Sequence, residues 1–266
     1  MYTAQFLYRR PNNLDEAQNM FQASADARYL AGGQSLIPAM KQRLASPSEL
    51  IDISRIPTLS FIRATPVALA IGAGTRHATV AASRDVHNSI PALAVLAGLI
   101  GDPAVRHRGT LGGSIANNDP AADYPAALIA LDAKILTNRR QIAAEQFFTG
   151  MFDTALEPGE IVTEVAFRVP QRAGYSKFPN PASRYAMPGV FVADFTGEIR
   201  VAVTGAASCV YRARELETAL NRQFAPGALT GVDIGAENLT SDIFASAEYR
   251  AHLIRVMAQR AVAGML

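Results

Sequence analysis

The chain has 266 residues, of which 49% are hydrophobic, so it can bury a substantial core in one large or two to three small domains. Its 25 Lys and Arg nearly balance its 23 Asp and Glu, without a block of like charge, which argues against nucleic acid or an anionic membrane as a partner. The single cysteine, Cys209, excludes an intrachain disulfide, a cysteine-ligated iron–sulfur cluster and a thiolate zinc site.

The N-terminal residues and the apolar runs bear on location. Residues 1–6 lack the basic and then apolar pattern of a secretory signal peptide. The longest apolar run, residues 90–100, is shorter than the roughly 20 residues that a membrane-spanning helix needs. A lone cysteine suits a reducing compartment, so we expect a cytoplasmic protein without a membrane span.

Residues 1–57 are expected to form a compact first unit. The pattern predicts strands at residues 4–8, 28–30 and 49–53, a helix that begins at Leu14 and a second helix at residues 36–44. Asn12 and Asn13 are candidates to cap the first helix. Between the second strand and the second helix lies Ala31-Gly32-Gly33-Gln34-Ser35, the first glycine segment.

Residues 58–170 are expected to form a second unit. The predicted elements are a hairpin of strands at 60–64 and 68–71, a helix from Thr79 to about residue 86, and a helix at 89–100 that Gly101-Asp102-Pro103 ends. The chain then enters Thr110-Leu111-Gly112-Gly113-Ser114, the second glycine segment. No G-x-G-x-x-G pattern follows a predicted strand, so the Rossmann fingerprint is absent.

Residues 171–266 are expected to form a third unit around a small antiparallel sheet. The proline-containing residues 177–186 suggest an extended link, strands are predicted at 198–204 and 205–210, and helices are predicted at 214–220 and 248–263. The last helix places Leu253, Ile254, Met257 and Ala261 on one face, which is typical of a helix packed on a core.

The two glycine segments have the same kind of chemistry. Adjacent glycines let the backbone adopt left-handed conformations and let a ligand approach closely, and their N–H groups can form an anion-binding concavity. Ser35, Thr110 and Ser114 add hydroxyls of the kind that bind phosphate oxygens. We hypothesise that both segments hold one phosphate-bearing cofactor; the alternative is two unrelated turns.

Other polar residues give weaker signals. Asp119, before Pro120, suits a turn, whereas Asp123 is expected to accept hydrogen bonds from sugar or ribityl hydroxyls, because a carboxylate repels phosphate. The four histidines, His77, His87, His107 and His252, have no catalytic-triad or metal-ligand spacing, and we interpret His77 and His107 as structural or surface residues.

Several motifs together resemble one family over nearly the whole chain. They are the two glycine segments with their flanks (residues 31–38 and 102–114), residues 117–123, residues 154–162, residues 180–186 and residues 246–250. In these motifs the sequence resembles the FAD-binding medium subunit of molybdenum hydroxylases, and in particular that of aerobic carbon monoxide dehydrogenase.

The resemblance implies an α+β fold related to vanillyl-alcohol oxidase, in which two α+β subdomains (1–57 and 58–170) clasp FAD and a C-terminal α+β domain (171–266) follows. It implies FAD contacts at Tyr29, Leu30, Ala31, Gly32, Gly33, Gln34, Ser35, Leu36, Ile100, Thr110, Leu111, Gly112, Gly113, Ser114, Asn117, Asp123, Ile161 and Lys177. Within this set, residues 29–36 and 110–114 would contact the pyrophosphate and ribityl chain, the Ile161 backbone the adenine, and Lys177 the flavin ring. Gln34 stands where the nearest subgroup often has histidine, and Ile100 where some relatives have an aromatic residue.

The implied function is electron transfer within a complex. A large molybdopterin subunit would oxidise the substrate, a small subunit with two [2Fe–2S] clusters would carry the electrons, and FAD on this chain would pass them to an external acceptor, in a dimer of heterotrimers. No catalytic or metal-ligating residue is expected on this chain. Two alternatives stay open: a stand-alone flavin oxidoreductase of the same fold, and a nucleotide-binding module without redox activity.

Overall fold

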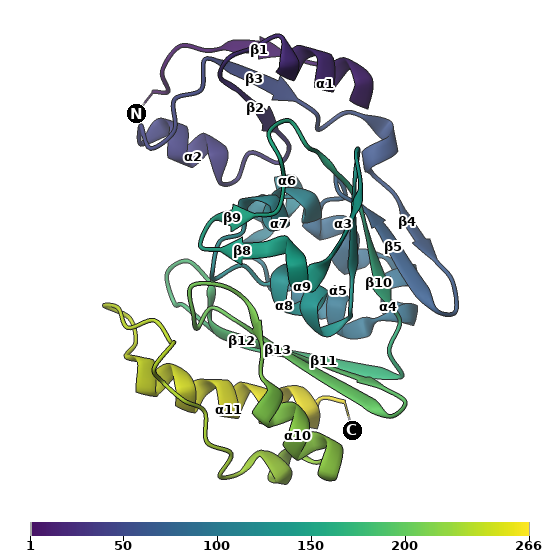
Figure 1. Cartoon of the computed structure of the whole chain (residues 1–266), viewed down its shortest axis with the longest axis vertical. Helices are drawn as coiled ribbons and strands as arrows, with labels where there is room; N and C mark the ends of the chain where they lie inside the picture. Colours follow the sequence, from purple (N-terminus) through teal and green to yellow (C-terminus); the bar gives the residue numbers. More distant parts are fainter. Residues whose placement is uncertain (1, 266) are drawn as a thin grey trace.

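The computed structural model describes residues 2–265, in which the three larger of four sheets follow one another along the long axis of the molecule (Figure 1). The first unit contains β1 (Leu7–Arg9), α1 (Leu14–Gln22), β2 (Ala27–Leu30), α2 (Leu36–Lys41) and β3 (Glu49–Asp52). Its strands are parallel, in the order β1-β3-β2. The Asn13 side chain accepts from the Glu16 amide and caps α1, as expected, and Ala17 and Ile51 lie in the small core beneath this helix.

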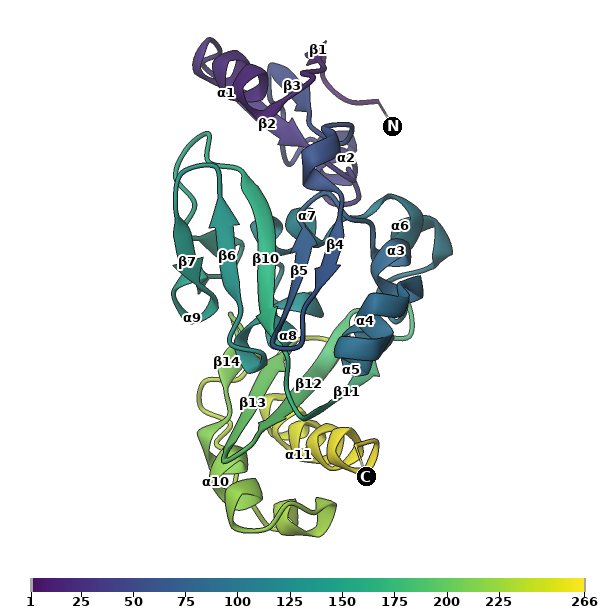
Figure 2. The same ribbon diagram turned by 90° about the vertical axis from the view of Figure 1, so that its right-hand side faces the viewer.

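The middle unit is a five-stranded antiparallel sheet with helices packed on one face (Figure 2). The strands, in spatial order, are β4 (Ile62–Ala64), β5 (Ala68–Gly72), β10 (Val162–Arg168), β6 (Lys134–Thr137) and β7 (Gln141–Ala143). The other elements are a 3₁₀ helix (Pro57–Leu59), α3 (His77–Ala82), α4 (Arg84–Ser89), α5 (Pro91–Gly98), α6 (Pro103–Arg108), α7 (Leu111–Asn117), α8 (Tyr124–Ala130), α9 (Ala144–Phe147), β8 (Phe148–Gly150) and β9 (Asp153–Thr154). Buried Leu69, Ile71 and Phe167 from the sheet meet Leu93 and Leu128 from the helices in the largest core.

Two helix predictions in this unit were wrong. The helix expected from Thr79 to residue 86 is two helices, because Ser83 ends α3 and its side chain accepts from the Val86 amide as the cap of α4. The segment after residue 101 was expected to lead directly to the second glycine segment. Instead Asp102 caps the unpredicted helix α6, with Pro103 in its first position.

The C-terminal sheet is antiparallel, in the order β11 (Arg172–Pro179), β12 (Ala186–Phe195), β13 (Glu198–Thr204) and β14 (Tyr211–Arg212). Strand β12 is buried on both faces: Val190 and Val192 join a core with α10 (Arg214–Arg222) and α11 (Ala247–Ala263), while Phe191 and Ala193 join the core of the middle unit. A strand covered on both sides reads as a continuous apolar run without alternation, and β12 was not predicted. The link predicted at 177–186 was too long, since only residues 180–185 connect β11 to β12.

The rest of the C-terminal unit follows the sequence more closely. The helices predicted at 214–220 and 248–263 correspond to α10 and α11, and a short 3₁₀ helix (Pro226–Leu229) lies between them. The strand predicted at 205–210 was wrong, because the strand in this region is β14, Tyr211–Arg212. None of the helices between residues 2 and 265 has both the length and the apolar character that a bilayer crossing requires.

Candidate functional site

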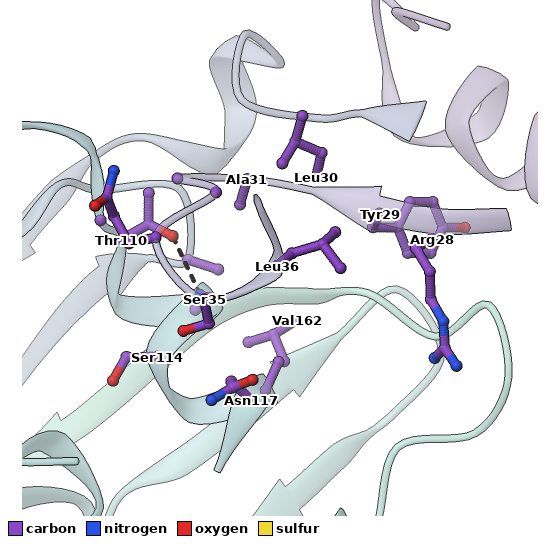
Figure 3. Close-up of a pocket in the computed structure, with 18 of the residues that line it drawn as sticks. Arg28, Tyr29, Leu30, Ala31, Ser35, Leu36, Thr110, Ser114, Asn117 and Val162 are labelled. Carbon is purple, nitrogen blue, oxygen red and sulfur yellow. Dashed lines mark hydrogen bonds between the residues drawn. The ribbon is translucent and has the colours of Figure 1, made fainter. Parts of the chain in front are cut away.

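A pocket of about 990 Å³ lies between the first unit and the middle unit. Its walls come from β2 and the first glycine segment on one side, and from α7, residues 157–162 and residues 183–185 on the other. Figure 3 shows Ser35, Ser114 and Asn117 in the same part of this pocket. The volume is at the upper end of the range for small-molecule and cofactor sites.

The first glycine segment is an open loop between β2 and α2. Gly33 has a φ of +73°, a left-handed conformation that favours glycine. Within residues 2–265, the amide groups of residues 32–36 donate to no other residue. Successive unpaired N–H groups at the wall of a pocket form the kind of concavity that binds an anion.

The second glycine segment differs from the expected loop. It is the first turn of α7, and its glycines have no left-handed φ. Its amides are already paired: Leu111 donates to the Thr75 carbonyl at 3.0 Å, Gly112 to the Ala73 carbonyl at 2.8 Å, and Gly113 to the Thr110 hydroxyl at 3.1 Å, the bond dashed in Figure 3. The prediction that this segment offers a free amide cradle was therefore wrong.

Close packing explains the glycines of the second segment. A Cβ added to Gly112 would lie 2.5 Å from the Cβ of Ala73 and 2.8 Å from its carbonyl oxygen. Such a contact is closer than real Cβ atoms approach, so α7 packs directly on the end of β5 only because residue 112 has no side chain.

The first glycine segment contacts the backbone at Gly109, the residue immediately before the second segment. A Cβ on Gly32 would lie 2.4 Å from the Arg108 carbonyl oxygen and 2.7 Å from the Gly109 Cα. The backbone of the first unit therefore packs directly on the backbone that leads into the second segment. This contact places the unpaired amides of the first segment beside Thr110.

Tyr29 connects the two units at another point of the pocket. Its hydroxyl donates to the Gly159 carbonyl oxygen at 3.3 Å, and its ring stacks on Phe21 with centroids 5.0 Å apart. Burial raises the pKa of Tyr29 to about 12, so the phenol stays protonated and remains a donor. The Tyr29 hydroxyl thus has a protein partner on the opposite wall.

Ile161 lines the pocket, but its backbone is largely occupied. Its amide donates to the Asn138 side-chain oxygen at 2.9 Å, and its carbonyl accepts from the Asn138 amide at 3.0 Å. A carbonyl oxygen has two lone pairs, so only the carbonyl of Ile161 remains available to a ligand.

Buried charge holds this wall in place. The Glu160 side chain is fully buried and accepts from Thr137 at 2.7 Å and from Arg140 at 3.0 Å. Although burial alone would raise it, the pKa of Glu160 falls to about 2 because of these hydrogen bonds and the Arg140 charge. Glu160 therefore fixes the turn that carries Gly159 and Ile161 to the end of β6 and to the turn between β6 and β7.

Asp123 is buried beside the pocket in a cluster with two residues of β11. Its Oδ1 accepts from the Tyr175 hydroxyl and lies 2.8 Å from the Lys177 ammonium, which also donates to the Leu99 carbonyl at 2.9 Å. Burial raises the pKa of Asp123, and the Lys177 charge opposes that rise. In residues 2–265 no other residue donates to Oδ2, which leaves this oxygen for a ligand hydroxyl.

Most residues expected at the site do line this pocket. They are Tyr29, Leu30, Ala31, Gly32, Gly33, Gln34, Ser35, Leu36, Ile100, Thr110, Gly112, Gly113, Ser114, Asn117, Asp123 and Ile161. The two exceptions are Leu111, which is buried in the core, and Lys177, whose side chain is 3% exposed and contacts Asp123 without lining the pocket.

Sequence reasoning missed several other lining residues. His77 was interpreted as structural or surface, yet it is 4% exposed and lines the pocket. Arg184 and Tyr185 reach the pocket from the loop between β11 and β12, which no pattern marked as a wall. Asn118 is buried as well, and its side-chain amide donates to the Gly150 and Asp153 carbonyls, which fixes the β8–β9 turn at the pocket edge.

Known proteins are similar to this chain in both sequence and architecture. The nicotine 6-hydroxylase medium subunit of Paenarthrobacter nicotinovorans is 34% identical, over 96% of this chain and 95% of that protein. The carbon monoxide dehydrogenase medium chain of Hydrogenophaga pseudoflava is 36% identical, over 98% of this chain and 97% of that protein.

Solved structures give the same result. A chain of the cyanide-inactivated form of Cu,Mo-CO dehydrogenase matches with a TM-score of 0.89 and 32% identity, covering 100% of this chain and 99% of that one. A chain of quinoline 2-oxidoreductase from Pseudomonas putida 86 matches with a TM-score of 0.90 and 28% identity, covering 100% and 98%. The expected α+β class is confirmed.

A family model described as the FAD binding domain in molybdopterin dehydrogenase matches residues 4–171. The pocket fits this cofactor, because a row of backbone amides that find no partner between residues 2 and 265 lines a space of cofactor size between two units. The chain belongs to this family of FAD-binding flavoprotein components of molybdopterin dehydrogenases, which are oxidoreductases.

Proposed function

We propose that this chain is the FAD-binding medium subunit of a molybdenum hydroxylase complex, and that it takes electrons from an iron–sulfur partner and passes them to an external acceptor. The observation that supports this most directly is the row of unpaired amides at residues 32–36, in a pocket between two units. The placement in a complex is supported by two relatives that match over nearly their whole length and are named as a medium subunit and a medium chain.

The cofactor would lie across the junction of the two units. The amides of residues 32–36 and the Ser35 hydroxyl would hold the pyrophosphate, so its two negative charges would be bound mainly by backbone N–H groups. Ser114 and Asn117 would supply side-chain hydrogen bonds, and the second segment would contribute shape rather than amides.

Two further contacts fit the remaining length of FAD. Asp123 Oδ2 would accept from a hydroxyl or ring N–H of the flavin half, while Tyr175 and Lys177 hold the carboxylate in one orientation. The Ile161 carbonyl would accept from the adenine amine. Lys177 would therefore act on the flavin through Asp123.

The bound flavin supplies a centre that accepts an electron pair and releases it singly or as a hydride. The chain's own residues that line the pocket would orient this group. A chain with one cysteine cannot hold two [2Fe–2S] clusters, so these would lie on a small subunit and the molybdopterin on a large one, in a dimer of heterotrimers.

Several finer points stay predictions. The large subunit would bind the substrate, and the names of two relatives mention nicotine and carbon monoxide. The domain boundaries at residues 57 and 170 and the cytoplasmic location also remain expectations from sequence.

The test is expression of the chain alone and together with candidate large and small subunits. We expect the lone chain to show the visible absorption of an oxidised flavin and to oxidise no organic substrate, whereas the assembled complex reduces this flavin when substrate is added. A phosphate ligand bound without flavin bands would contradict FAD binding. Turnover by the lone chain would instead support the stand-alone oxidoreductase.

A further inference from the structure

His77 is a buried polar residue that has no part in the cofactor contacts proposed above. It is the first residue of α3 and is 4% exposed, and its backbone amide donates to the Gly109 carbonyl at 3.0 Å. A Cβ added to Gly109 would lie 2.6 Å from Nε2 and 2.7 Å from Cδ2, so this edge of the imidazole faces Gly109. Both residues line the pocket, at the point where the two glycine segments meet.

The other side of the ring faces the protein interior. Nδ1 is fully buried and has no hydrogen-bond partner among the described residues, and the same is true of the Tyr124 hydroxyl. The His77 and Tyr124 rings have their centroids 5.4 Å apart. Unpaired buried polar atoms on two neighbouring rings are the setting in which a buried water bridges protein groups, because leaving either atom unpaired is costly.

The charge state of His77 is set by its surroundings. Burial first, and then the nearby Arg106 guanidinium, lower the pKa of His77 to about 4, so the imidazole is neutral near neutral pH. A neutral imidazole has one N–H donor and one acceptor nitrogen. Burial likewise raises the pKa of Tyr124, so its hydroxyl keeps the proton that it needs to act as a donor towards Nδ1.

We propose that His77 is a further cofactor-binding residue, whose Nε2–H donates to an oxygen of the cofactor where the two glycine segments meet. The Tyr124 hydroxyl, through one buried water, makes Nδ1 the acceptor and so places the ring proton on Nε2. This inference deepens the proposed function and rests on FAD as the ligand. The oxygen belongs either to a phosphate or to the flavin half, and the experiment distinguishes the two.

The experiment measures FAD affinity of the deflavinated full chain by quenching of flavin fluorescence. His77→Leu removes the donor, and we expect FAD to bind about 10 to 100 times more weakly. His77→Gln, whose amide reaches the Nε2 position, should restore most of the affinity, whereas His77→Asn, whose amide reaches only the Nδ1 position, should not. Thermal unfolding of each apoprotein shows whether the variant is folded.

Two fragments of FAD locate the acceptor oxygen. If ADP loses affinity for His77→Leu and riboflavin does not, the acceptor is a phosphate oxygen; the reverse pattern assigns it to the flavin half. Tyr124→Phe should weaken FAD binding several-fold, since the ring proton is then free to move to Nδ1.

The outcomes that overturn the proposal differ from those that overturn FAD binding itself. Wild-type protein without flavin bands would remove the proposed function. Wild-type affinity in folded His77→Leu, or a loss that His77→Gln does not restore, would leave FAD binding intact and show that His77 only packs. Wild-type affinity in Tyr124→Phe would remove the role of the buried water.

Discussion

The two glycine segments share a composition but use it in different physical ways. In the first, the amides of residues 32–36 have no partner in the part of the chain that the structure describes, and Gly33 is left-handed, so the backbone itself is available to a ligand. In the second, Thr110 and the carbonyls of Ala73 and Thr75 take the amides, and the missing side chains allow two backbones to touch. The same residue type thus makes an anion site in one place and a packing contact in the other.

The largest effect is expected for Gly32→Val. Its Cβ would press on the Arg108 carbonyl, which is backbone and cannot move aside, so the first segment would be displaced from the pocket. We expect FAD occupancy to fall more than about tenfold, measured as flavin absorbance per chain. Gly227→Val is the matched control, because none of the residues from 2 to 265 lies within 4 Å of a Cβ there. Full flavin in Gly32→Val would show that the segments need not touch.

Acid is expected to destabilise the folded protein through His77. Its pKa is near 6.5 in the unfolded chain and about 4 in the folded one, so protons bind preferentially to the unfolded state between these values. The free energy of unfolding should therefore fall as pH drops from about 6.5 towards 4, by roughly 2 kcal/mol at about pH 5. Urea unfolding of wild type and of His77→Gln, each at about pH 6.5 and about pH 5, measures this change in the free energy of unfolding.

The acid prediction has an internal control. Glu160, whose pKa is about 2, loses its contribution only below about pH 4.5, so it stays almost intact at about pH 5, where the His77 effect is measured. Equal acid sensitivity in wild type and His77→Gln would mean that His77 is not buried in its neutral form.

Gly112→Ala tests the packing role of the second segment. In an exposed helix this change would stabilise by up to about 1 kcal/mol, but here the new Cβ meets Ala73 at 2.5 Å. We expect a net destabilisation of about 1–3 kcal/mol in urea unfolding of the apoprotein. An unchanged or increased stability would show that α7 can move away from β5 at little cost.

A pair of hydroxyl removals gives the smallest and most selective effects. Thr110→Ala removes the cap of α7 and should cost the apoprotein about 1 kcal/mol of stability. The Ser35 side chain makes no capping bond, so Ser35→Ala should leave apoprotein stability within about 0.5 kcal/mol and weaken FAD binding several-fold. If the two variants exchanged these behaviours, the assignment of the two segments would be reversed.

Local signals in the sequence were sufficient for much of the fold. Asn13 before an acidic first turn marked the start of α1, and the apolar run after Pro91 marked α5. Strand β12 escaped, because burial on both faces removes the alternation that identifies a strand. The break at Ser83 also escaped, because a single serine inside a predicted helix is tolerated and does not by itself mark a cap.

The candidate site was predictable where glycine and hydroxyl patterns cluster, and not where partners are distant in sequence. No local pattern shows that carbonyls at residues 73 and 75 pair with the amides of residues 111 and 112. Asp123 was expected as a ligand-facing carboxylate, but its contact with Tyr175 and Lys177 depends on a distant strand, β11, that the sequence did not reveal. No sequence pattern around His77 indicated a function, and only its burial beside Gly109 in the folded chain marks it as a candidate site residue.

Strand β12 has a practical consequence for anyone who divides this chain. The residues matched by the family model end at 171, where β11 is about to begin, yet Phe191 and Ala193 lie in the same core as Leu93 and Leu128. A truncated chain that stops there would leave the lower faces of α5 and α8 open to water and prone to aggregation. The flavin-binding half should therefore be produced, crystallised or fused to other proteins only with the C-terminal sheet attached.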